Sequence, residues 1–254
     1  MRLSIVLTLI SFIANAQTYK AIYIINFISN LDTKAVRTER AFLIIKNNQN
    51  SSYASENTYK QDSILRLVND GKLNKYDVMN DKYPKTDFKH FVQKNYIDKE
   101  LQVSNLIFTD NYIYKQKNSL IWQLQTDTLT IQNYVCHKAT TTCEGRNYIA
   151  WYTKEIPISD GPYKFWGLPG LMVKIYDTEK QYDFSLESFE KYTENPYFKP
   201  FQTKKKFDVS YEKFKSLNKE FIENPLKTLE DRGIKPMKPI KPTNEKKPNP
   251  IERY

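Results

Sequence analysis

Few side chains in this sequence could do metal or nucleophilic chemistry. The chain has two histidines, His90 and His137, and two cysteines, Cys136 and Cys143, so a histidine-based metal cage or catalytic triad has little material. His90 falls in an alternating strand pattern, where a surface or core histidine is more common than a metal ligand. Cys136 and His137 are adjacent, so on a strand they point to opposite faces and do not chelate one ion together. We predict neither a metal nor a cofactor.

Acid–base chemistry has little more support. Glu155 and Asp160 form only a weak candidate for a carboxylate pair. The stretch that follows, GPYKFWGLPGLM (Gly161–Met172), lacks the serine of a nucleophile elbow and the lysine and hydroxyl residue of a phosphate-binding loop. Asp160, within Ser-Asp-Gly-Pro, is more typical of a side-chain turn bond than of a catalytic acid. We predict no catalytic residue.

The two cysteines raise the question of a disulfide. A strand that starts at Cys136 and runs into the turn Cys-Glu-Gly-Arg would carry the two Cα atoms too far apart for a disulfide. A Cys136–Cys143 disulfide is therefore disfavoured but left open. The alternative is a buried Cys136 with a partly exposed Cys143.

The stretch Gly161–Met172 is better suited to architecture and binding. Pro169 fixes its own φ angle, and Gly170 can take the positive φ of a type II turn, so Leu168–Leu171 is predicted as a tight turn that leads into a strand. Aromatic residues surround the lysine just before this turn. If the protein binds a ligand through this region, the candidate residues are Tyr163, Lys164, Trp166, Trp151 and Arg146.

The elements that must position these residues are mostly strands. Runs rich in β-branched and aromatic residues predict strands over 20–29, 41–47, 88–96, 101–110 and 111–117. Two hairpins follow, 134–142 with 147–153 and 171–176 with 181–189. Helices are expected over 62–71, with Asp62 as N-cap, and over 210–225, where apolar residues recur at helical spacing. The predicted fold class is mainly β (β-rich α+β), a curved antiparallel sheet or half-barrel with one or two packed helices.

The two ends of the chain differ from its middle. Residues 1–16 combine Arg2, an uncharged apolar run and small residues, and predict a signal peptide cleaved before Gln17. Residues 17–233 are predicted as a single β-rich domain. Residues 234–254 are a Lys/Pro-rich tail, either solvated or docked on a partner. We expect an exported protein of the periplasm or cell envelope, or a secreted one, without a mature transmembrane anchor.

The charge of the chain has a simple explanation. Its formal net charge is +10, but the lysines are scattered except at the C-terminus, which favours surface solvation over nucleic-acid binding. Peripheral membrane contact stays open, and the oligomeric state is not predicted.

The hexapeptide Gly167–Met172, with GRNYIAWYTKEIPISDGPYKF before it, resembles the GLPGLI family of exported Bacteroidetes proteins. Cys136, Gly145, Arg146 and the closing Asn249–Glu252 also fit the family pattern. Met172 replaces an isoleucine, and Cys143 lies outside the pattern, which weakens the disulfide further. The motif residues expected to be structural are Gly161, Pro162, Gly167, Leu168, Pro169, Gly170 and Leu171.

The resemblance implies an envelope or secreted location and no established activity. Three functions stay in view. The first is a non-catalytic binding or carrier module, whose concave sheet takes a hydrophobic ligand, lipid or peptide, in a shape like that of periplasmic lipoprotein carriers. The second is an accessory partner of an outer-membrane transport system, which binds through the aromatic stretch or the tail. A hydrolase is the least favoured.

Overall fold

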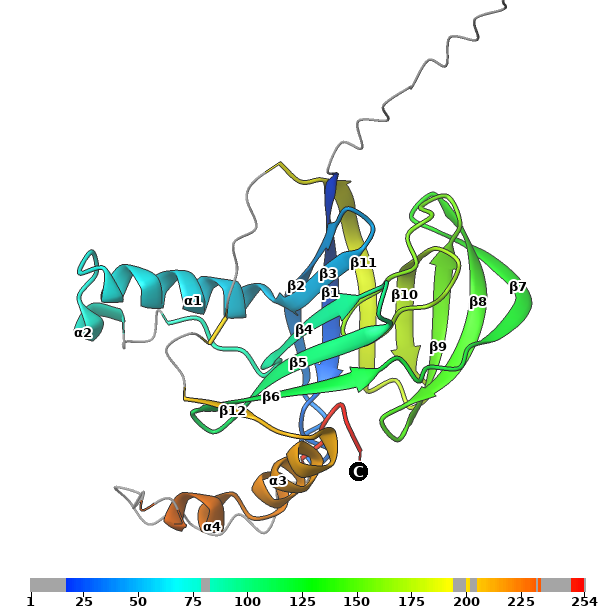
Figure 1. Cartoon of the computed structure of the whole chain (residues 1–254). Coiled ribbons are helices and arrows are strands. Elements are labelled where there is room, and N and C mark those ends of the chain that lie inside the picture. The colour runs from blue at the N-terminus through cyan, green and yellow to red at the C-terminus, as the bar shows by residue number, and fades with distance from the viewer. Residues whose placement is uncertain are drawn as a thin grey trace, which may run out of the picture.

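The computed structural model describes residues 17–78, 83–193, 200–201, 205–231, 233 and 248–253 (Figure 1). The predicted signal peptide and residues 234–247 of the predicted tail lie outside the described residues. The described chain is mainly β, as predicted, and its strands form one large curved sheet.

The sheet has twelve strands in the order β12-β6-β5-β4-β3-β2-β1-β11-β10-β9-β8-β7. Neighbours pair antiparallel except β12 and β6, which run parallel, a departure from the all-antiparallel expectation. The strands are β1 (Thr18–Ile28), β2 (Val36–Lys46), β3 (Asn50–Ser55), β4 (His90–Asn95), β5 (Glu100–Ile107), β6 (Asp110–Lys117), β7 (Gln123–Ile131), β8 (Tyr134–Cys143), β9 (Arg146–Thr153), β10 (Leu171–Asp177), β11 (Tyr182–Lys191) and β12 (Lys206–Asp208).

Both predicted hairpins are present as β8–β9 and β10–β11, and β1 pairs antiparallel with β2. Strands β3, β7 and the three-residue β12 were missed. The sequence of β3, Asn-Ser-Ser-Tyr-Ala-Ser, has small polar residues that the fold nevertheless buries between β2 and β4. Strand β7 is an edge strand that pairs only with β8 and is exposed along nearly its whole length, so no buried face imposes a hydrophobic alternation.

Four helices are described: α1 (Glu56–Asn69), α2 (Lys75–Val78), α3 (Tyr211–Glu223) and α4 (Pro225–Glu230). The prediction of Asp62 as an N-cap is wrong, because Ser55 caps α1 through a bond from the Thr58 N–H at 3.1 Å. Asp62 instead lies inside the helix and pairs with Arg66 at 3.2 Å. Helix α3 is confirmed, with Ser210 as its N-cap.

The core lies on the concave side of the sheet. Strands β4–β6 form one wing and β7–β9 the other, with β1, β11 and β10 between them (Figure 1). Buried side chains from every part of the curve meet there, including Tyr23, Val103, Ala150 and Phe184. Helix α1 packs against β2 and β3, and α3 packs against β6.

The long connection between β9 and β10 fills the space between the two wings. Phe165 is fully buried, with its ring centroid 4.6 Å from that of Tyr148 on β9 and 6.0 Å from that of Phe184 on β11. On β10, Leu171, Val173 and Ile175 are buried, and Met172 between them is buried too. The register of the β9–β10 pairing shifts after Met172, and Gly161 of the loop packs against the Met172 side chain.

The described cysteines are both free, and both are buried. The expectation of a partly exposed Cys143 is wrong, since it is only 7% exposed. The chain's C-terminal segment covers the β8–β9 turn next to it, where the Arg253 N–H donates to Glu144 O at 2.8 Å. Burial raises the pKa of the Cys143 thiol to about 12, so the thiol is protonated at neutral pH.

Candidate functional site

The turn at Leu168–Leu171 is tight but is not a type II turn. The Gly170 N–H donates to Leu168 O at 2.8 Å, while the Leu171 N–H goes to Ile156 O at 3.0 Å. Ile156, earlier in the loop, thus accepts from the Leu171 N–H, which in a type II turn would donate to the Leu168 carbonyl. Gly170 has φ +154°, and a Cβ there would overlap the carbonyl oxygen of Thr153. The glycine is therefore required by close backbone approach.

The loop is fixed to β4 by a buried ion pair. Lys94 Nζ lies 2.6 Å from Asp160 Oδ1, and it also donates to Gly161 O at 2.6 Å and Phe165 O at 3.0 Å. Neither charged side chain contacts solvent. Burial lowers the pKa of Lys94, and Asp160 opposes that effect. Asp160 also accepts from the Gly161 N–H at 2.8 Å, so it makes the predicted turn bond and anchors the loop as well.

A second buried cluster surrounds Lys164. Its Nζ lies 2.6 Å from Glu252 and 2.9 Å from Glu144, and the hydroxyls of Tyr163 and Tyr211 donate to these two carboxylates. Burial alone would lower the pKa of Lys164, but Glu252 and its other neighbours hold it well above its usual value. Burial alone would raise the pKa of Glu252, but Lys164 lowers it to about 2. Both groups are therefore charged at neutral pH.

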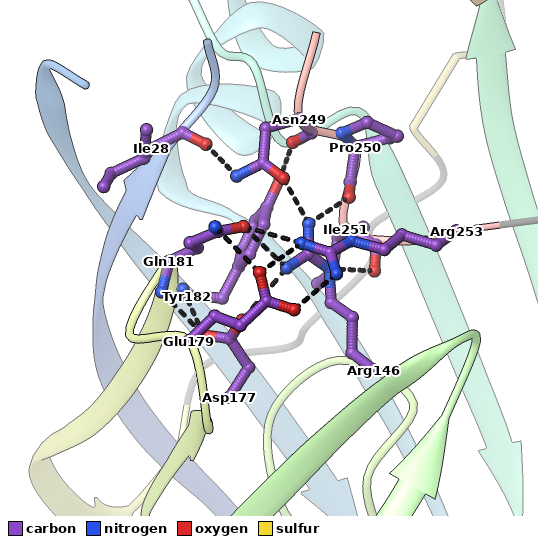
Figure 2. A network of polar contacts seen from close by, with 10 residues as sticks. All are labelled: Ile28, Arg146, Asp177, Glu179, Gln181, Tyr182, Asn249, Pro250, Ile251 and Arg253. Carbon is purple, nitrogen blue, oxygen red and sulfur yellow. Dashed lines mark hydrogen bonds and ion pairs between the residues drawn. The ribbon is translucent and has the colours of Figure 1, made fainter. Parts of the chain in front are cut away.

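A third cluster centres on Arg146, at the start of β9 (Figure 2). Its Nη1 lies 2.9 Å from Asp177 Oδ2, its Nε donates to Ile251 O at 3.1 Å, and its Nη2 donates to Pro250 O at 2.8 Å and to the side chain of Asn249. The guanidinium carbon lies 4.8 Å from the ring centroid of Tyr182. Arg146 is 2% exposed.

These contacts hold the C-terminal segment Pro248–Arg253, which we call the clasp. Asn249 donates from its backbone to Ser29 O at 3.0 Å and from its side chain to Ile28 O at 2.6 Å. Tyr182 donates to Asn249 O at 2.5 Å, and Ile251 is buried in the core. The described end of the predicted tail is therefore packed into the domain, which corrects the expectation of a solvated tail for these residues.

The clasp thus contacts candidate residues that are far from it in the sequence. Of the five candidate binding residues, Tyr163, Lys164, Trp166 and Arg146 are at most 4% exposed. Three of them contact the clasp directly. Trp151 is partly exposed on the outer face of β9, paired with Lys138 of β8 and Lys174 of β10.

Sequence reasoning missed the acidic partners Glu144, Asp177 and Glu252. The signal that the sequence offers for Glu252 is the closing Asn249–Glu252, which fits the pattern of the GLPGLI family. The weak carboxylate pair is not assembled, because Glu155 is exposed and accepts from the Val135 N–H at 2.8 Å, whereas Asp160 is buried against Lys94.

A cavity of about 400 Å³ lies between the clasp, α3 and the concave face of the sheet. We call it the clasp cavity. Its apolar walls include Phe27, Phe88, Tyr182, Phe221, Ile222 and Ile251. His90 also lines it, and its Nδ1, shielded from solvent, has no hydrogen-bond partner among the residues that the structure describes. Burial lowers the pKa of His90 to about 4, so the ring is neutral at physiological pH.

Two further observations concern chemistry and membranes. Across the described ranges, no group of three or more His, Cys, Asp or Glu side chains is placed to hold a metal ion. In the same part of the chain, no helix has both the length and the apolar character needed to cross a membrane. Asp160 and Glu252 are both engaged in buried ion pairs, so neither is arranged as a general acid or base.

Comparison with known proteins gives a short sequence match and a broader structural one. A family described as "Protein of unknown function (Porph_ging)" matches residues 142–174, the part that contains the hexapeptide and the loop before it. No curated protein matches the sequence.

Two structures of PNGF-II, in space groups C2 and P21, resemble this fold. They have TM-scores of 0.53 and 0.52 at 16% and 15% identity, and 80% of this chain is covered. The chain spans about a third of PNGF-II, 32% and 33% of its length in the two structures. A LolA superfamily protein from Nitrosomonas europaea has a TM-score of 0.29 at 8% identity, over 70% of this chain and 87% of that one. The similarity to PNGF-II concerns the fold and not the activity.

Proposed function

We propose that this protein is a non-catalytic binding module of the bacterial cell envelope, related to the GLPGLI family, and that its ligand lies in the clasp cavity. The ligand class is a small amphipathic molecule, with an apolar body such as an acyl chain and one hydrogen-bonding group. The proposal includes export by the predicted signal peptide.

The observation that carries this proposal is the unpaired Nδ1 of His90 beside a cavity with aromatic walls. Leaving a buried polar atom without a partner costs about 1–3 kcal/mol, and a ligand with a hydrogen-bonding group at that place would recover the loss. The cavity volume of about 400 Å³ falls within the range of about 300–1,000 Å³ that is usual for small-molecule sites. Aromatic walls are also typical of such sites, and half of the lining residues, among them Arg37, Asp87 and Lys89, are polar or charged.

The alternative is an accessory protein of an outer-membrane transport system. The aromatic stretch that was expected to contact such a partner is buried against the domain's own chain, with Tyr163, Phe165 and Trp166 at most 4% exposed. A partner would therefore need another surface. The open edge of β7, with Leu124 at 59% and Leu129 at 50% exposure, is the best available.

The experiment is a titration of the mature protein with a fluorescent polyene fatty acid. We expect one saturable site per chain. Phe221→Asp on α3 places a charge in the cavity wall and should weaken binding about tenfold or more. Lys219→Asp, on the same helix but not part of the cavity wall, is the matched control and should bind normally.

A second variant tests the hydrogen bond. His90→Phe should weaken binding of the fatty acid but not of a matching fluorescent hydrocarbon without the carboxyl group. Absence of saturable binding by the unaltered protein, or equal binding by Phe221→Asp and Lys219→Asp, would show that the clasp cavity is not the ligand site.

A further inference from the structure

A second cavity lies on the outer side of the β9–β10 loop, and we call it the corner cavity. Its volume is about 530 Å³, and it shares no lining residue with the clasp cavity. The loop contributes Pro157, Ile158, Ser159, Trp166 and Gly167 to its wall. Two hairpin turns and the residue after β6 complete it with Asn48, Tyr96, Lys99 and Asn118. The stretch that matches the Porph_ging family model therefore forms about half of the wall of this cavity.

Trp166, one of the lining residues, carries an unused hydrogen-bond donor. Trp166 is 4% exposed, and its indole Nε1 is buried without a partner among the residues that the structure describes. The indole N–H only donates, so what it lacks is an acceptor. Its ring lies 5.6 Å from that of Tyr96, centroid to centroid, and its backbone carbonyl accepts from Trp122 Nε1 at 2.8 Å. The donor is thus held in a fixed position.

Several other side chains of the corner cavity also carry hydrogen-bond donors. Asn118 accepts from the Leu120 N–H through Oδ1 at 3.2 Å, which leaves its amide nitrogen beside Gly167. Asn48 and Ser159 are exposed and add an amide and a hydroxyl. Lys99 is exposed and adds a positive charge that no acid of the described chain neutralises at ion-pair distance.

No carboxylate of the described chain lines the cavity. Asp160 lies behind the cavity wall, where its carboxylate accepts from the Tyr96 hydroxyl and is paired with Lys94 at 2.6 Å. A set of donors and one cation, without a competing carboxylate, is the arrangement that binds an oxyanion.

The cavity is also rigid. Lys94 donates to two backbone carbonyls of the loop, Gly161 O and Phe165 O, and Asp160 pairs with Trp166 in an isolated β-bridge. Gly167 has φ +98°, a conformation that L-residues rarely adopt. Preformed donors lose little conformational entropy when a ligand binds.

We propose that the corner cavity is a binding site for a small molecule that carries an oxyanion, either a carboxylate or a phosphate. Trp166 Nε1 and the Asn118 amide donate to the oxyanion, Lys99 supplies the counter-charge, and the remaining volume holds the organic part of the ligand. This site is independent of the function proposed for the clasp cavity.

The indole N–H of Trp166 offers a direct readout by two-dimensional NMR of the ¹⁵N-labelled mature protein. The chain has three tryptophans, and Trp166→Phe identifies the resonance of Trp166 by its loss. Acetate and inorganic phosphate are titrated separately against chloride at constant ionic strength. We expect a saturable shift of the Trp166 resonance with at least one of the two anions, and none for Trp151. The anion that acts separates the carboxylate from the phosphate ligand.

Lys99→Gln should weaken that binding by roughly fivefold, equivalent to about 1 kcal/mol. Lys115→Gln is the matched control, because Lys115 is exposed, pairs with Glu100 at 3.1 Å and does not line the cavity. A Trp166 resonance that responds to neither anion, or a response that Lys99→Gln leaves unchanged, would overturn the proposal.

Discussion

At the scale of single residues, the unusual feature is the number of charges that have no access to solvent. Lys94, Arg146 and Lys164 are each at most 2% exposed, and each meets an acidic partner and further acceptors. Removing ions from water is costly, so such pairs add little net stability over an apolar packing. They do penalise any arrangement that leaves one partner unpaired. We infer that they specify how the loop and the clasp are placed.

Gly170 provides the residue-scale prediction. Gly170→Ala should destabilise the fold by about 1–3 kcal/mol, because the added Cβ would overlap the Thr153 carbonyl oxygen, which the pairing of β9 with β10 holds in place. Thermal unfolding followed by circular dichroism measures the loss. Gly71→Ala is the control, since Gly71 has φ +69° but nothing within 4 Å of its Cβ position. Equal losses in the two variants would show that backbone angle, and not close approach, requires the glycine.

At the scale of elements, three segments that are distant in sequence depend on one another. The β8–β9 hairpin supplies Glu144 and Arg146, the β9–β10 loop supplies Lys164, and the clasp supplies Asn249 and Glu252. Without the clasp, Lys164 and Arg146 would keep only part of their partners in a buried site. The clasp is therefore an integral element of the domain.

Removal of the clasp tests this dependence. A chain that ends at Lys247 should lose about 3–5 kcal/mol of unfolding free energy, the usual cost of breaking a buried ion pair. Urea denaturation measures this loss. A synthetic peptide Pro-Asn-Pro-Ile-Glu-Arg, added in trans, should restore stability in a concentration-dependent way. The same peptide with Glu252→Lys is the control. A truncated chain as stable as the full one would mean that the clasp contacts are incidental.

At the scale of the whole molecule, the curved sheet encloses a core that its own loop and clasp nearly fill. The concave face is therefore mostly packed, and the clasp cavity and the corner cavity lie next to the clasp and the loop. We expect the domain to unfold as one cooperative unit. Protonation of a buried group near the clasp should therefore change the free energy of unfolding of the whole domain.

Global unfolding should depend on pH through His90. The pKa of His90 is about 4 in the folded protein and 6.5 when unperturbed, so between these values the unfolded chain binds more protons. Stability therefore falls as the pH drops from 6.5 towards 4, by up to about 3 kcal/mol. The facing groups Glu252 and Lys164 remain charged in this window. Glu252, with a pKa of about 2, would add its own loss only below about pH 4.5.

Urea unfolding at pH 7 and pH 5 measures the effect. His90→Phe should flatten the pH dependence in this interval. An unchanged slope in that variant would assign the dependence to other groups.

Local patterns were enough to predict much of the fold. Alternation in the β10–β11 hairpin and the turn in the β8–β9 hairpin depend on residues a few positions apart, and both hairpins are confirmed. The same reasoning missed β7, which has no buried face, and β3, whose serines are buried by neighbours that the local sequence does not reveal. The prediction of Asp62 as an N-cap was wrong because Ser55, about two helical turns earlier, offers an equivalent capping side chain.

The sequence by itself determined the mainly β class and most strands, because each depends on short-range backbone preferences. It also placed a tight corner at Pro169 and Gly170, but the geometry of that corner depends on the close approach of Gly170 to the Thr153 carbonyl. Only the tertiary structure decided that Arg146 would meet Asn249, or that Lys164 would meet Glu252. Such pairs form when a curved sheet brings distant segments into one buried volume, where each charge must find a partner. Hydrophobic periodicity carries no information about which segments share that volume.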